Sequence, residues 1–569
     1  MTGGGSSAAE VLSTFSEAVQ QTIAARGDEQ ALTFLPDGEI ERAESFSFAE
    51  LDGAARTVAV DLQATGVGRG DRVMLLQQPG FHMVIGFLGC IYAGAIAVPA
   101  YPPSPFMGSR GDERLRSILR DAGATAVLTA STLMPLLQNL RDSDAALSWV
   151  LTDEPAGAAD AYEPVEVSPG DVVFLQYTSG STSDPRGVRV THGSLVANTR
   201  MLCDAFGLSD KSICCSWVPP FHDMGLIGGI LTPLAAGMHS VQMAPEAFLR
   251  RPERWLRALT HYGATYSGAP NFAYDLCVRR VENLDGLDLS RWAVAINGAE
   301  PVREKTLAAF ADKFAPCGFD AASLYAAYGL AEATLLVSTR PRGADSTLSV
   351  SPEALADGRL ELEDAANGRP LVSCGPPVSG TEVAIVDPES GDELADGVVG
   401  EIWVSGPHVC DGYWNSPTLS AEVFPAGTLR TGDLGFLWQG EVFVTGRMKD
   451  LLIIRGRNHY PQDLEQTMEA AAPDLRPGCG VAVTLGTDTG ERLVLIQELT
   501  RASKGDPEAL VEAIRRQVNE GHGVAVDEIV LVKSGSVQKT TSGKVRRSST
   551  SAALEAGELT IIHRWTAST

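Results

Sequence analysis

The sequence predicts an α/β protein with a large N-terminal domain of parallel, helix-covered sheets, a small β subdomain and a small, mobile α+β C-terminal domain. Helix-like and strand-like segments alternate from Ala9 onward, which is typical of parallel sheets covered by helices. Between Cys374 and Phe443, short β-prone runs alternate with Gly/Asp turns, which indicates antiparallel pairing. The 569 residues also exceed what one hydrophobic core holds, so the chain is expected to divide into domains.

The alternation is clearest in the first part of the chain. We expect a strand at Arg72–Gln77, a helix at Phe81–Tyr92 and a strand at Ala95–Pro99. The pattern then repeats with a helix at Glu113–Asp121, a strand at Thr125–Thr129 and a helix at Thr132–Leu140. The stretch His82–Ala100 is nearly long enough to span a bilayer, but its glycines and prolines divide it into a buried helix and a buried strand, so no membrane span is expected.

Composition limits the class of function. The formal net charge of −26 and the pI near 4.8 disfavour a nucleic-acid-binding protein, because phosphate backbones would be repelled. The nine cysteines are scattered without metal-type spacing, which indicates buried thiols in a reducing compartment. The first ten residues lack the basic and apolar regions of a signal peptide, so a cytoplasmic location is expected.

A polar loop, Tyr177–Thr191, is the centre of the predicted site. The apolar run Val172–Leu175 precedes it and a helix at His192–Phe206 follows, so the loop is expected on a strand-to-helix connection, where α/β folds bind ligands. Glycines Gly180 and Gly187 allow close approach of an anion, hydroxyl groups come from Thr178, Ser179, Ser181, Thr182 and Ser183, and Arg186 adds a cationic fork. The loop lacks the Gly-Lys-Ser/Thr of a Walker A motif, and a solvated turn is the alternative interpretation.

Further polar turns follow along the chain. Ser216–Leu231 contains His222 and Asp223 ahead of a small, Gly-dotted apolar helix, and the pair would either cap that helix or meet a substrate. Three strand-to-turn junctions come next, at Ala264–Pro270, Ala293–Pro301 and Leu324–Thr334. Turns after the carboxyl ends of parallel strands gather around one crevice, so the chemistry is expected there.

The domain organisation is predicted from the second half of the chain. Thr339–Leu371 interrupts the alternation but carries apolar residues, which indicates an ordered insertion that packs on another part of the protein. Strands are expected at Glu382–Val386, Glu401–Val404 and Glu441–Val444 of the β subdomain. We expect an N-terminal domain at residues 1–446, with the insertion at 339–371 and the β subdomain at 372–446, a hinge at 447–450, and a C-terminal domain at 451–569.

Attack on a nucleoside triphosphate requires an anion cradle, a carboxylate for Mg²⁺, a ribose acceptor, an adenine-stacking ring and a cation for the developing charge. The chain offers a candidate for each in one order: Thr178–Gly187, Glu332, Asp433, Tyr328 and Lys544. Each has a plainer interpretation, as a helix cap, a core ring, a turn aspartate or a surface lysine. Their joint appearance favours the functional interpretation.

The ordered motifs resemble the adenylate-forming superfamily, which includes acyl-CoA synthetases, luciferases and peptide-synthetase adenylation domains. The matching motifs are YTSGSTSDPRG, YGLAE, TGD, GRMKD and SGK, and the resemblance covers nearly the whole chain. It is strongest to the fatty acyl-AMP ligase branch, with FHDMGLIGG, NGAEPV, RTGDLGF, IRGRNHYPQDLE and KTTSGKVRR. As in that branch, Ser183 and Arg186 replace the usual glycine and lysine of the loop, and Thr339–Leu371 lies where the branch carries its insertion.

The resemblance implies roles for individual residues. Lys544, Glu332, Thr178 and His222 are implied as catalytic, with Glu332 also holding Mg²⁺ and Lys449 at the hinge position. The residues implied to bind ATP are Thr178, Ser179, Gly180, Ser181, Thr182, Arg186, Gly298, Ala299, Glu300, Tyr328, Gly329, Asp433, Arg447 and Lys544. Those implied to line the acyl tunnel are His222, Asp223, Met224, Gly225, Tyr266, Ser267 and Gly268.

The activity that the resemblance implies is the Mg²⁺- and ATP-dependent conversion of a fatty acid to an acyl-adenylate with release of pyrophosphate. The acyl group is then expected to pass to the phosphopantetheine of an acyl carrier protein, in lipid, polyketide or lipopeptide biosynthesis. The alternatives are a fatty acyl-CoA synthetase, an amino-acid adenylation domain, which lacks its amine-binding aspartate here, and a non-catalytic acyl or nucleotide sensor. Neither nucleic acid nor a membrane span is expected to take part.

Overall fold

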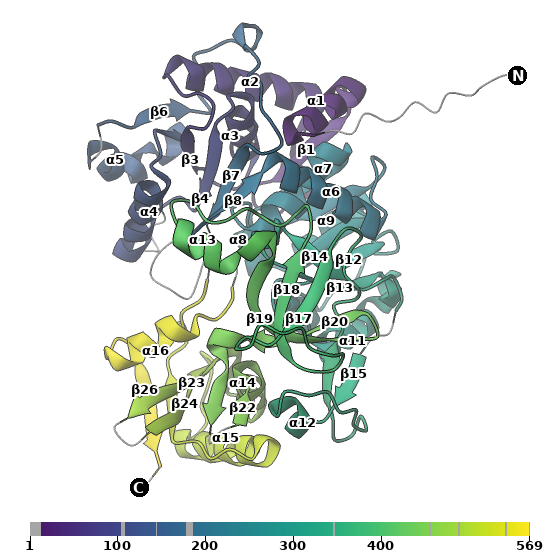
Figure 1. Ribbon diagram of the computed structural model, residues 1–569, viewed down its shortest axis with the longest axis vertical. Coiled ribbons are helices and arrows are strands. Elements are labelled where there is room, and N and C mark those ends of the chain that lie inside the picture. Colours follow the sequence, from purple (N-terminus) through teal and green to yellow (C-terminus); the bar gives the residue numbers. More distant parts are fainter. Residues whose placement is uncertain are drawn as a thin grey trace, which may run out of the picture.

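A computed structural model describes residues 13–103, 108–143, 145–177, 186–344, 347–454, 457–487, 490–540 and 543–567. Figure 1 shows two stacked sheets with their helices at the top and centre, the β subdomain below them, and the C-terminal domain at the lower end. The predicted α/β architecture is confirmed. In the described ranges, no helix combines the length and apolar character needed to cross a bilayer.

The larger sheet is parallel through its middle and antiparallel at both edges. Its strands, in spatial order, are β14 (Leu336–Thr339), β13 (Leu324–Gly329), β12 (Val294–Asn297), β11 (Tyr266–Ala269), β9 (Ile213–Ser216), β10 (His239–Met243), β1 (Gln30–Leu35) and β2 (Glu44–Ser47). One face packs against α1 (Phe15–Arg26), α6 (His192–Phe206), α7 (Thr232–Ala236) and the π-helix Met224–Leu231. The other packs against α8 (Pro245–Arg250), α9 (Glu253–Tyr262), α10 (Asn271–Arg280) and α11 (Glu304–Phe314). Both faces are therefore buried, as parallel strands require.

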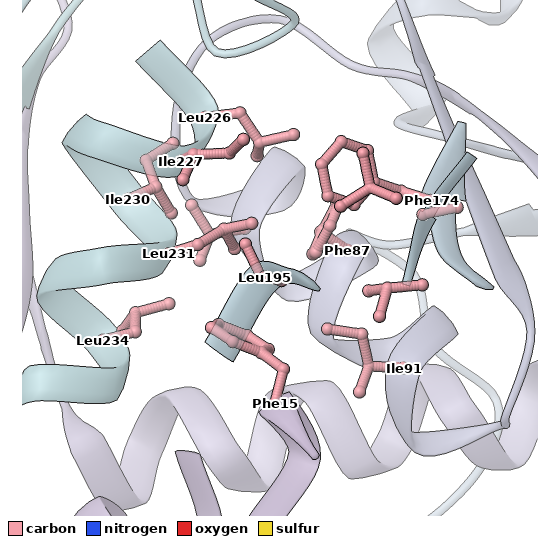
Figure 2. Packing of buried hydrophobic residues seen from close by; sticks show 14 of the residues in the cluster. Phe15, Phe87, Ile91, Phe174, Leu195, Leu226, Ile227, Ile230, Leu231 and Leu234 are labelled. Carbon is pink, nitrogen blue, oxygen red and sulfur yellow. The ribbon is translucent and has the colours of Figure 1, made fainter. Parts of the chain in front are cut away.

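The second sheet has the order β6 (Ser148–Leu151), β5 (Ala126–Thr129), β3 (Arg72–Leu76), β4 (Ile96–Ala100), β7 (Val172–Tyr177) and β8 (Gly187–Thr191). Helices α2 (Phe48–Ala64) and α3 (Phe81–Tyr92) cover one face, and α4 (Gly108–Ala122) and α5 (Met134–Ser143) cover the other. Side chains from both sheets share one core, part of which Figure 2 shows, including Phe87 and Phe174 beside Leu226 and Ile227.

The structure corrects one expectation about the polar loop. A strand, β8, lies between the loop and helix α6 and pairs antiparallel with β7, so the loop joins two strands and not a strand to a helix. The physical reason is the alternation within Gly187–Thr191: Val188 and Val190 are fully buried, while Arg189 between them is partly exposed. Helix α6 begins at His192 and ends at Phe206, as predicted.

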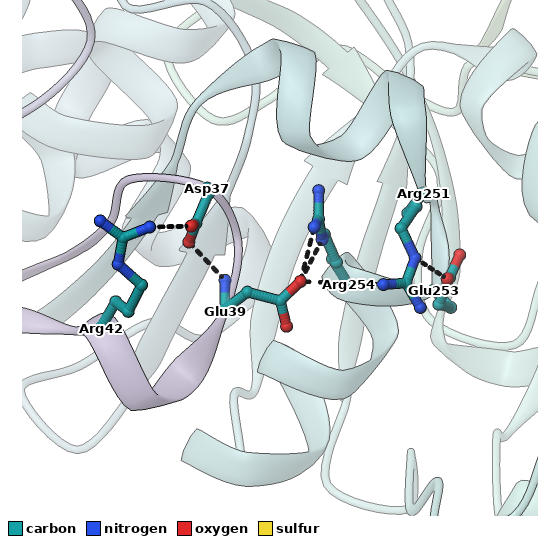
Figure 3. A network of polar contacts seen from close by, with 6 residues as sticks. All are labelled: Asp37, Glu39, Arg42, Arg251, Glu253 and Arg254. Atoms are coloured by element: carbon teal, nitrogen blue, oxygen red, sulfur yellow. Dashed lines mark hydrogen bonds and ion pairs between the residues drawn. The ribbon is translucent and has the colours of Figure 1, made fainter.

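A network of charges fastens the β1–β2 connection to helix α9 (Figure 3). Arg254 donates from Nε to the Glu39 carboxylate at 2.9 Å, and Arg42 lies 2.5 Å from Asp37 in the same connection. The turn needs glycine at position 38, because its φ is +78° and a Cβ there would lie 2.8 Å from the Arg254 Cδ. The outer edge of the larger sheet is thus fixed to its covering helices.

The β subdomain is the antiparallel sheet β17 (Glu382–Val386), β18 (Gly400–Ser405), β19 (Leu429–Trp438) and β20 (Glu441–Arg447), with α13 (Pro417–Val423) beside it. The predicted insertion forms β15 (Thr347–Val350), α12 (Pro352–Ala356) and β16 (Arg369–Val372). Its buried Val350, Leu355 and Leu371 share a cluster with Phe436 and Tyr460, so it packs on both the β subdomain and the C-terminal domain.

The C-terminal domain has a sheet of β23 (Leu475–Thr487), β24 (Gly490–Leu499), β25 (Glu528–Val532) and β26 (Ile561–Thr566). Helices α14 (Pro461–Ala470) and α15 (Pro507–His522) pack on one face and α16 (Arg547–Glu555) on the other. The short hairpin β21 (Leu452–Ile454) and β22 (Arg457–His459) precedes them. This α+β arrangement agrees with the sequence prediction.

Candidate active site

A cavity of about 2600 Å³ lies among the larger sheet, the β subdomain and the C-terminal domain. Expected site residues from distant parts of the sequence line it together: Arg186, His222, Asp223, Met224, Tyr266, Gly268, Gly298, Ala299, Glu300, Tyr328, Gly329, Glu332, Asp433, Arg447, Lys449 and Lys544. The polar turns therefore converge, as their places after the parallel strands predict. Thr178–Thr182 lie outside the described residues.

The strand ends of the larger sheet form one wall of this cavity. After β12, Ala299 adopts the left-handed conformation, with φ +66°, and turns the chain so that Glu300 faces the cavity. At the end of β13, a Cβ on Gly329 would lie 1.8 Å from the Leu335 carbonyl oxygen, so only glycine allows the chain to pass there.

Asp433 is the centre of a buried polar group in the β subdomain. The Tyr328 hydroxyl donates to its Oδ2 at 2.8 Å, and Arg447 donates from Nε to its Oδ1 at 3.0 Å. Asp433 and Arg447 are partners across β19 and β20, so the register of this hairpin sets their contact. The charge of Asp433 raises the pKa of Arg447, whose side chain remains 63% exposed and open to a ligand.

Glu332 lies in the short turn after β13, and the Tyr413 hydroxyl donates to its Oε1 at 2.9 Å. Burial raises the pKa of the Glu332 carboxyl, while the Tyr413 hydrogen bond and the Arg447 charge oppose the rise. Tyr413 is held here because the Trp414 N–H donates to the Gly187 carbonyl at the start of β8, at 2.7 Å. Sequence reasoning missed Tyr413, which carries no recognisable signal between α13 and β18.

Glu332 suits a metal bound largely by a substrate. The described residues contain no group of three or more His, Cys, Asp or Glu side chains able to hold a metal ion. Mg²⁺ is commonly held by one or two carboxylates together with substrate phosphates, and the partly buried carboxylate of Glu332 is suited to provide one such contact.

Lys544 comes to the cavity from the C-terminal domain. Burial lowers the pKa of its ammonium group, while the nearby carboxylates of Asp223, Glu300 and Asp433 raise it. Its loop is closed by two hydrogen bonds to Thr540, from the Lys544 N–H to Oγ1 at 3.0 Å and from the Thr540 N–H to the Lys544 carbonyl at 2.7 Å. Lys544 thus stands among three carboxylates contributed by other segments, and the positive charge of Arg447 opposes their effect on its pKa.

Phe272, at the beginning of α10, receives the lysine loop. A Cβ on Gly543 would lie 3.2 Å from the Phe272 ring, so the loop backbone packs directly on that ring. The Phe272 N–H donates to Glu300 Oε1 at 2.5 Å, which fixes the carboxylate beside the loop. Burial raises the pKa of Glu300. Sequence reasoning missed Phe272, since an aromatic residue opening a helix usually belongs to the core.

His222 and Asp223 lie at the entrance of the π-helix. Burial lowers the pKa of His222 to about 4, so its ring is neutral at pH 7. Asp223 caps the helix, since its Oδ1 accepts the Met224 N–H at 2.7 Å. Both residues also line the cavity, so the capping and the pocket interpretations hold together.

The part of the cavity lining beside the π-helix is mainly apolar, and this part is called the apolar branch. Figure 2 shows Leu226, Ile227, Ile230 and Leu231 of the π-helix directed into the core. Gly228 and Gly229 of this helix line the cavity, together with Leu202, Phe206, Tyr266 and Leu335. A channel without side chains on one wall can admit a hydrocarbon chain.

Two of the expected tunnel residues lie elsewhere. Ser267 is fully buried in the outer core, where its hydroxyl accepts from Trp255 Nε1 at 3.0 Å and donates to the Cys215 carbonyl. The alternation of a strand directs Tyr266 and Gly268 to one face and Ser267 to the other, a signal that the sequence already contained. Gly225 is absent from the described cavity lining, because it packs against the Pro219 carbonyl.

Fold and site together define an enzyme whose C-terminal domain delivers a lysine to a polar cavity at the ends of parallel strands. The chain belongs to the AMP-binding enzyme family, whose sequence model matches residues 19–414. Residues 449–564 match a second model, the AMP domain of Disco-interacting protein 2-like proteins.

Individual relatives agree with the resemblance to fatty acyl-AMP ligases, which is confirmed. Over 541 residues the chain is 42% identical to the medium-chain-fatty-acid–[acyl-carrier-protein] ligase JamA of Moorena producens, with 91% of each chain covered. A fatty acyl-adenylate ligase from L. pneumophila, solved in complex with acyl adenylate and pyrophosphate, is 37% identical with a TM-score of 0.75, covering 98% of both chains. A structure from a study of fatty acyl-adenylate ligases from E. coli and L. pneumophila has a TM-score of 0.88 at 32% identity, covering 96% of this chain and 99% of the other.

Proposed function

We propose that this protein activates a fatty acid with ATP to an acyl-adenylate and transfers the acyl group to the phosphopantetheine thiol of an acyl carrier protein in the cytoplasm. One observation carries the proposal. Lys544, Glu332 and Asp433 line a single cavity that continues into an apolar branch. A polar site for a nucleotide and an apolar site for a hydrocarbon chain therefore meet at one place.

In the first step, a carboxylate oxygen of the fatty acid forms a bond to the α-phosphorus of ATP. The bond from that phosphorus to the oxygen bridging the β-phosphate breaks, and pyrophosphate leaves with this electron pair. No protein nucleophile is needed, so the residues act by position and charge. In the second step, the thiol sulfur bonds to the acyl carbon, AMP leaves with the anhydride oxygen, and the thiol proton is released.

The residues have the following proposed roles. Asp433, oriented by Tyr328 and Arg447, accepts hydrogen bonds from the ribose hydroxyls. Lys544 matches the negative charge that develops at the α-phosphate, and the loop Thr178–Thr182 with Arg186 holds the phosphates. Glu332 would hold Mg²⁺, which when bound supplies a Lewis acid that neutralises phosphate charge.

Neutral His222 borders the fatty carboxylate without adding a charge of its own. The apolar branch beyond Met224 then holds the chain and excludes water from the reacting groups. We assign the adenine ring to the surface formed by Gly298, Ala299 and Tyr328.

Replacement of Lys544 tests the first step. Lys544→Ala is expected to lower fatty-acid-dependent pyrophosphate release about a hundredfold or more, because a preorganised electrostatic contact is lost, while ATP binding stays measurable. Lys533→Ala is the matched control, an exposed lysine of the same domain that does not line the cavity. Near-normal pyrophosphate release by Lys544→Ala would remove Lys544 from the mechanism.

We infer from the insertion that a carrier protein, and not free CoA, accepts the acyl group. Arg369 of β16 lies 2.7 Å from Asp463 of α14, and both side chains are about one-fifth exposed. The insertion thereby restrains the domain rotation that a CoA-dependent ligase uses. Purified enzyme is expected to acylate a holo-carrier protein and not free CoA. Robust formation of acyl-CoA would contradict the carrier-protein acceptor and favour the acyl-CoA synthetase alternative.

A further inference from the structure

The hydroxyl of Tyr266 has no hydrogen-bond partner among the described residues, although its side chain is only 4% exposed. Two other buried tyrosines use their hydroxyls: Tyr274 donates to the Ile296 carbonyl at 2.7 Å, and Tyr92 donates to Asp52 at 2.8 Å. Burial raises the pKa of Tyr266 well above its ordinary value, so the phenol keeps its proton and can both donate and accept. The group is thus an unused hydrogen-bonding site.

This hydroxyl lies at the wall of the apolar branch. It is 3.2 Å from the position that a Cβ would take on Gly228, and a methyl of Leu335 is 3.5 Å from the same position. The ring of Phe206 lies 6.4 Å from that of Tyr266, and Cys214 is its neighbour across the sheet. All these residues line the cavity, so a chain in the branch passes the hydroxyl amid apolar groups.

The depth of Tyr266 separates it from the reacting carboxylate. Gly268, two residues further along β11, lies on the same face and nearer the strand's carboxyl end, where the nucleotide residues are. A Cβ on Gly268 would lie 2.7 Å from the Met224 methyl, which marks the entrance of the branch. At about 3.3 Å per residue, the Tyr266 Cα is about 7 Å further from that end than the Gly268 Cα. The Tyr266 hydroxyl lies beside Gly228, which follows Met224 along the π-helix, so it meets the body of the acyl chain.

A plain hydrocarbon would exclude water from this hydroxyl and leave it without a hydrogen-bond partner, which carries a free-energy cost. Phenylalanine would fill the same space without that cost. An oxygen-containing group on the acyl chain would form a hydrogen bond with the Tyr266 hydroxyl in place of water. We propose that the preferred substrates are fatty acids with a hydroxyl or keto oxygen along the chain, and that Tyr266 determines this specificity. The proposal rests on the proposed function and adds the substrate class.

The test compares an unsubstituted fatty acid with the set of its positional hydroxy isomers, using pyrophosphate release to obtain kcat/KM. At least one isomer with a mid-chain hydroxyl is expected to have a kcat/KM about tenfold higher than that of the plain acid. This ratio corresponds to one hydrogen bond of about 1.4 kcal/mol. In Tyr266→Phe, the ratio of kcat/KM for that isomer to the plain acid is expected to fall about tenfold.

Tyr274→Phe is the matched control, because it removes a buried hydroxyl outside the described cavity lining and is expected to leave the ratio unchanged. The proposal is overturned if no hydroxy isomer has a higher kcat/KM than the plain acid. It is also overturned if Tyr266→Phe lowers kcat/KM for both substrates equally. Either result would mean that the Tyr266 hydroxyl hydrogen-bonds to water and that the side chain only forms part of the wall of the apolar branch. Failure to release pyrophosphate with every acid would instead contradict the proposed function.

Discussion

The contact between Arg369 and Asp463 predicts how firmly the insertion holds the C-terminal domain. The guanidinium of Arg369 lies 2.7 Å from the Asp463 carboxylate and 5.3 Å from the centre of the Tyr460 ring, which is itself buried in the cluster joining the insertion to the C-terminal domain. Burial raises the pKa of Asp463, and the charges of Arg369 and Arg303 oppose that rise. Arg369→Gln leaves Asp463 buried with one cation fewer.

The free energy that Arg369→Gln removes from the contact between the insertion and the C-terminal domain lies between two limits. Removing one partner of a fully buried ion pair costs about 3–5 kcal/mol, and an exposed pair contributes about 0–1 kcal/mol. Arg369 and Asp463 are 19% and 20% exposed, and Arg303 remains nearby, so we expect a loss of about 2 kcal/mol. The equilibrium between attached and detached C-terminal domain then shifts about thirtyfold towards detachment.

Hydrogen exchange measures this shift directly. Amides of α14 that exchange through detachment of the domain are expected to exchange about thirtyfold faster in Arg369→Gln. The matched control is Arg342→Gln, which breaks the pair with Asp320, where both side chains are about half exposed. It is expected to change exchange less than about threefold. Unchanged α14 exchange in Arg369→Gln, or an equal effect of the control, would refute the argument that the insertion restrains the domain.

Two further predictions concern single buried groups. Tyr413→Phe removes the hydrogen bond that lowers the pKa of Glu332, so we expect half-maximal adenylation to need severalfold more Mg²⁺. An unchanged Mg²⁺ titration would mean that the Tyr413 hydrogen bond does not influence metal binding. Burial lowers the pKa of His408 from 6.5 to about 4, so the unfolded chain binds the extra proton between these values and stability falls as pH decreases through that window. Between pH 6.5 and 5 the loss is about 1.6 kcal/mol. Denaturant titrations are expected to show a smaller loss in His408→Gln, and an equal loss in both proteins would assign the acid sensitivity to other groups.

Local patterns in the sequence were sufficient to predict most of the helices and strands. Phe81–Tyr92 and Glu382–Val386 form α3 and β17 with the predicted bounds, because their apolar spacing and flanking glycines act over a few residues. The same kind of pattern was available for β8 and for Ser267 but was not used: alternation at Val188 and Val190 indicates a strand, and alternation along β11 turns Ser267 away from the cavity.

The motifs, their order and the kinds of element that carry them could be read from the sequence, and they were enough to identify the family and the candidate residues. Which of these residues meet became known only from the packing of the folded chain. Tyr413 and Glu332 are 81 positions apart yet hydrogen-bonded, and Lys544 reaches Asp223, Glu300 and Asp433 from a separate domain. The reason is physical: periodicity reports whether a side chain is buried, whereas its partner across a cavity depends on how sheets and domains pack, which no local spacing encodes.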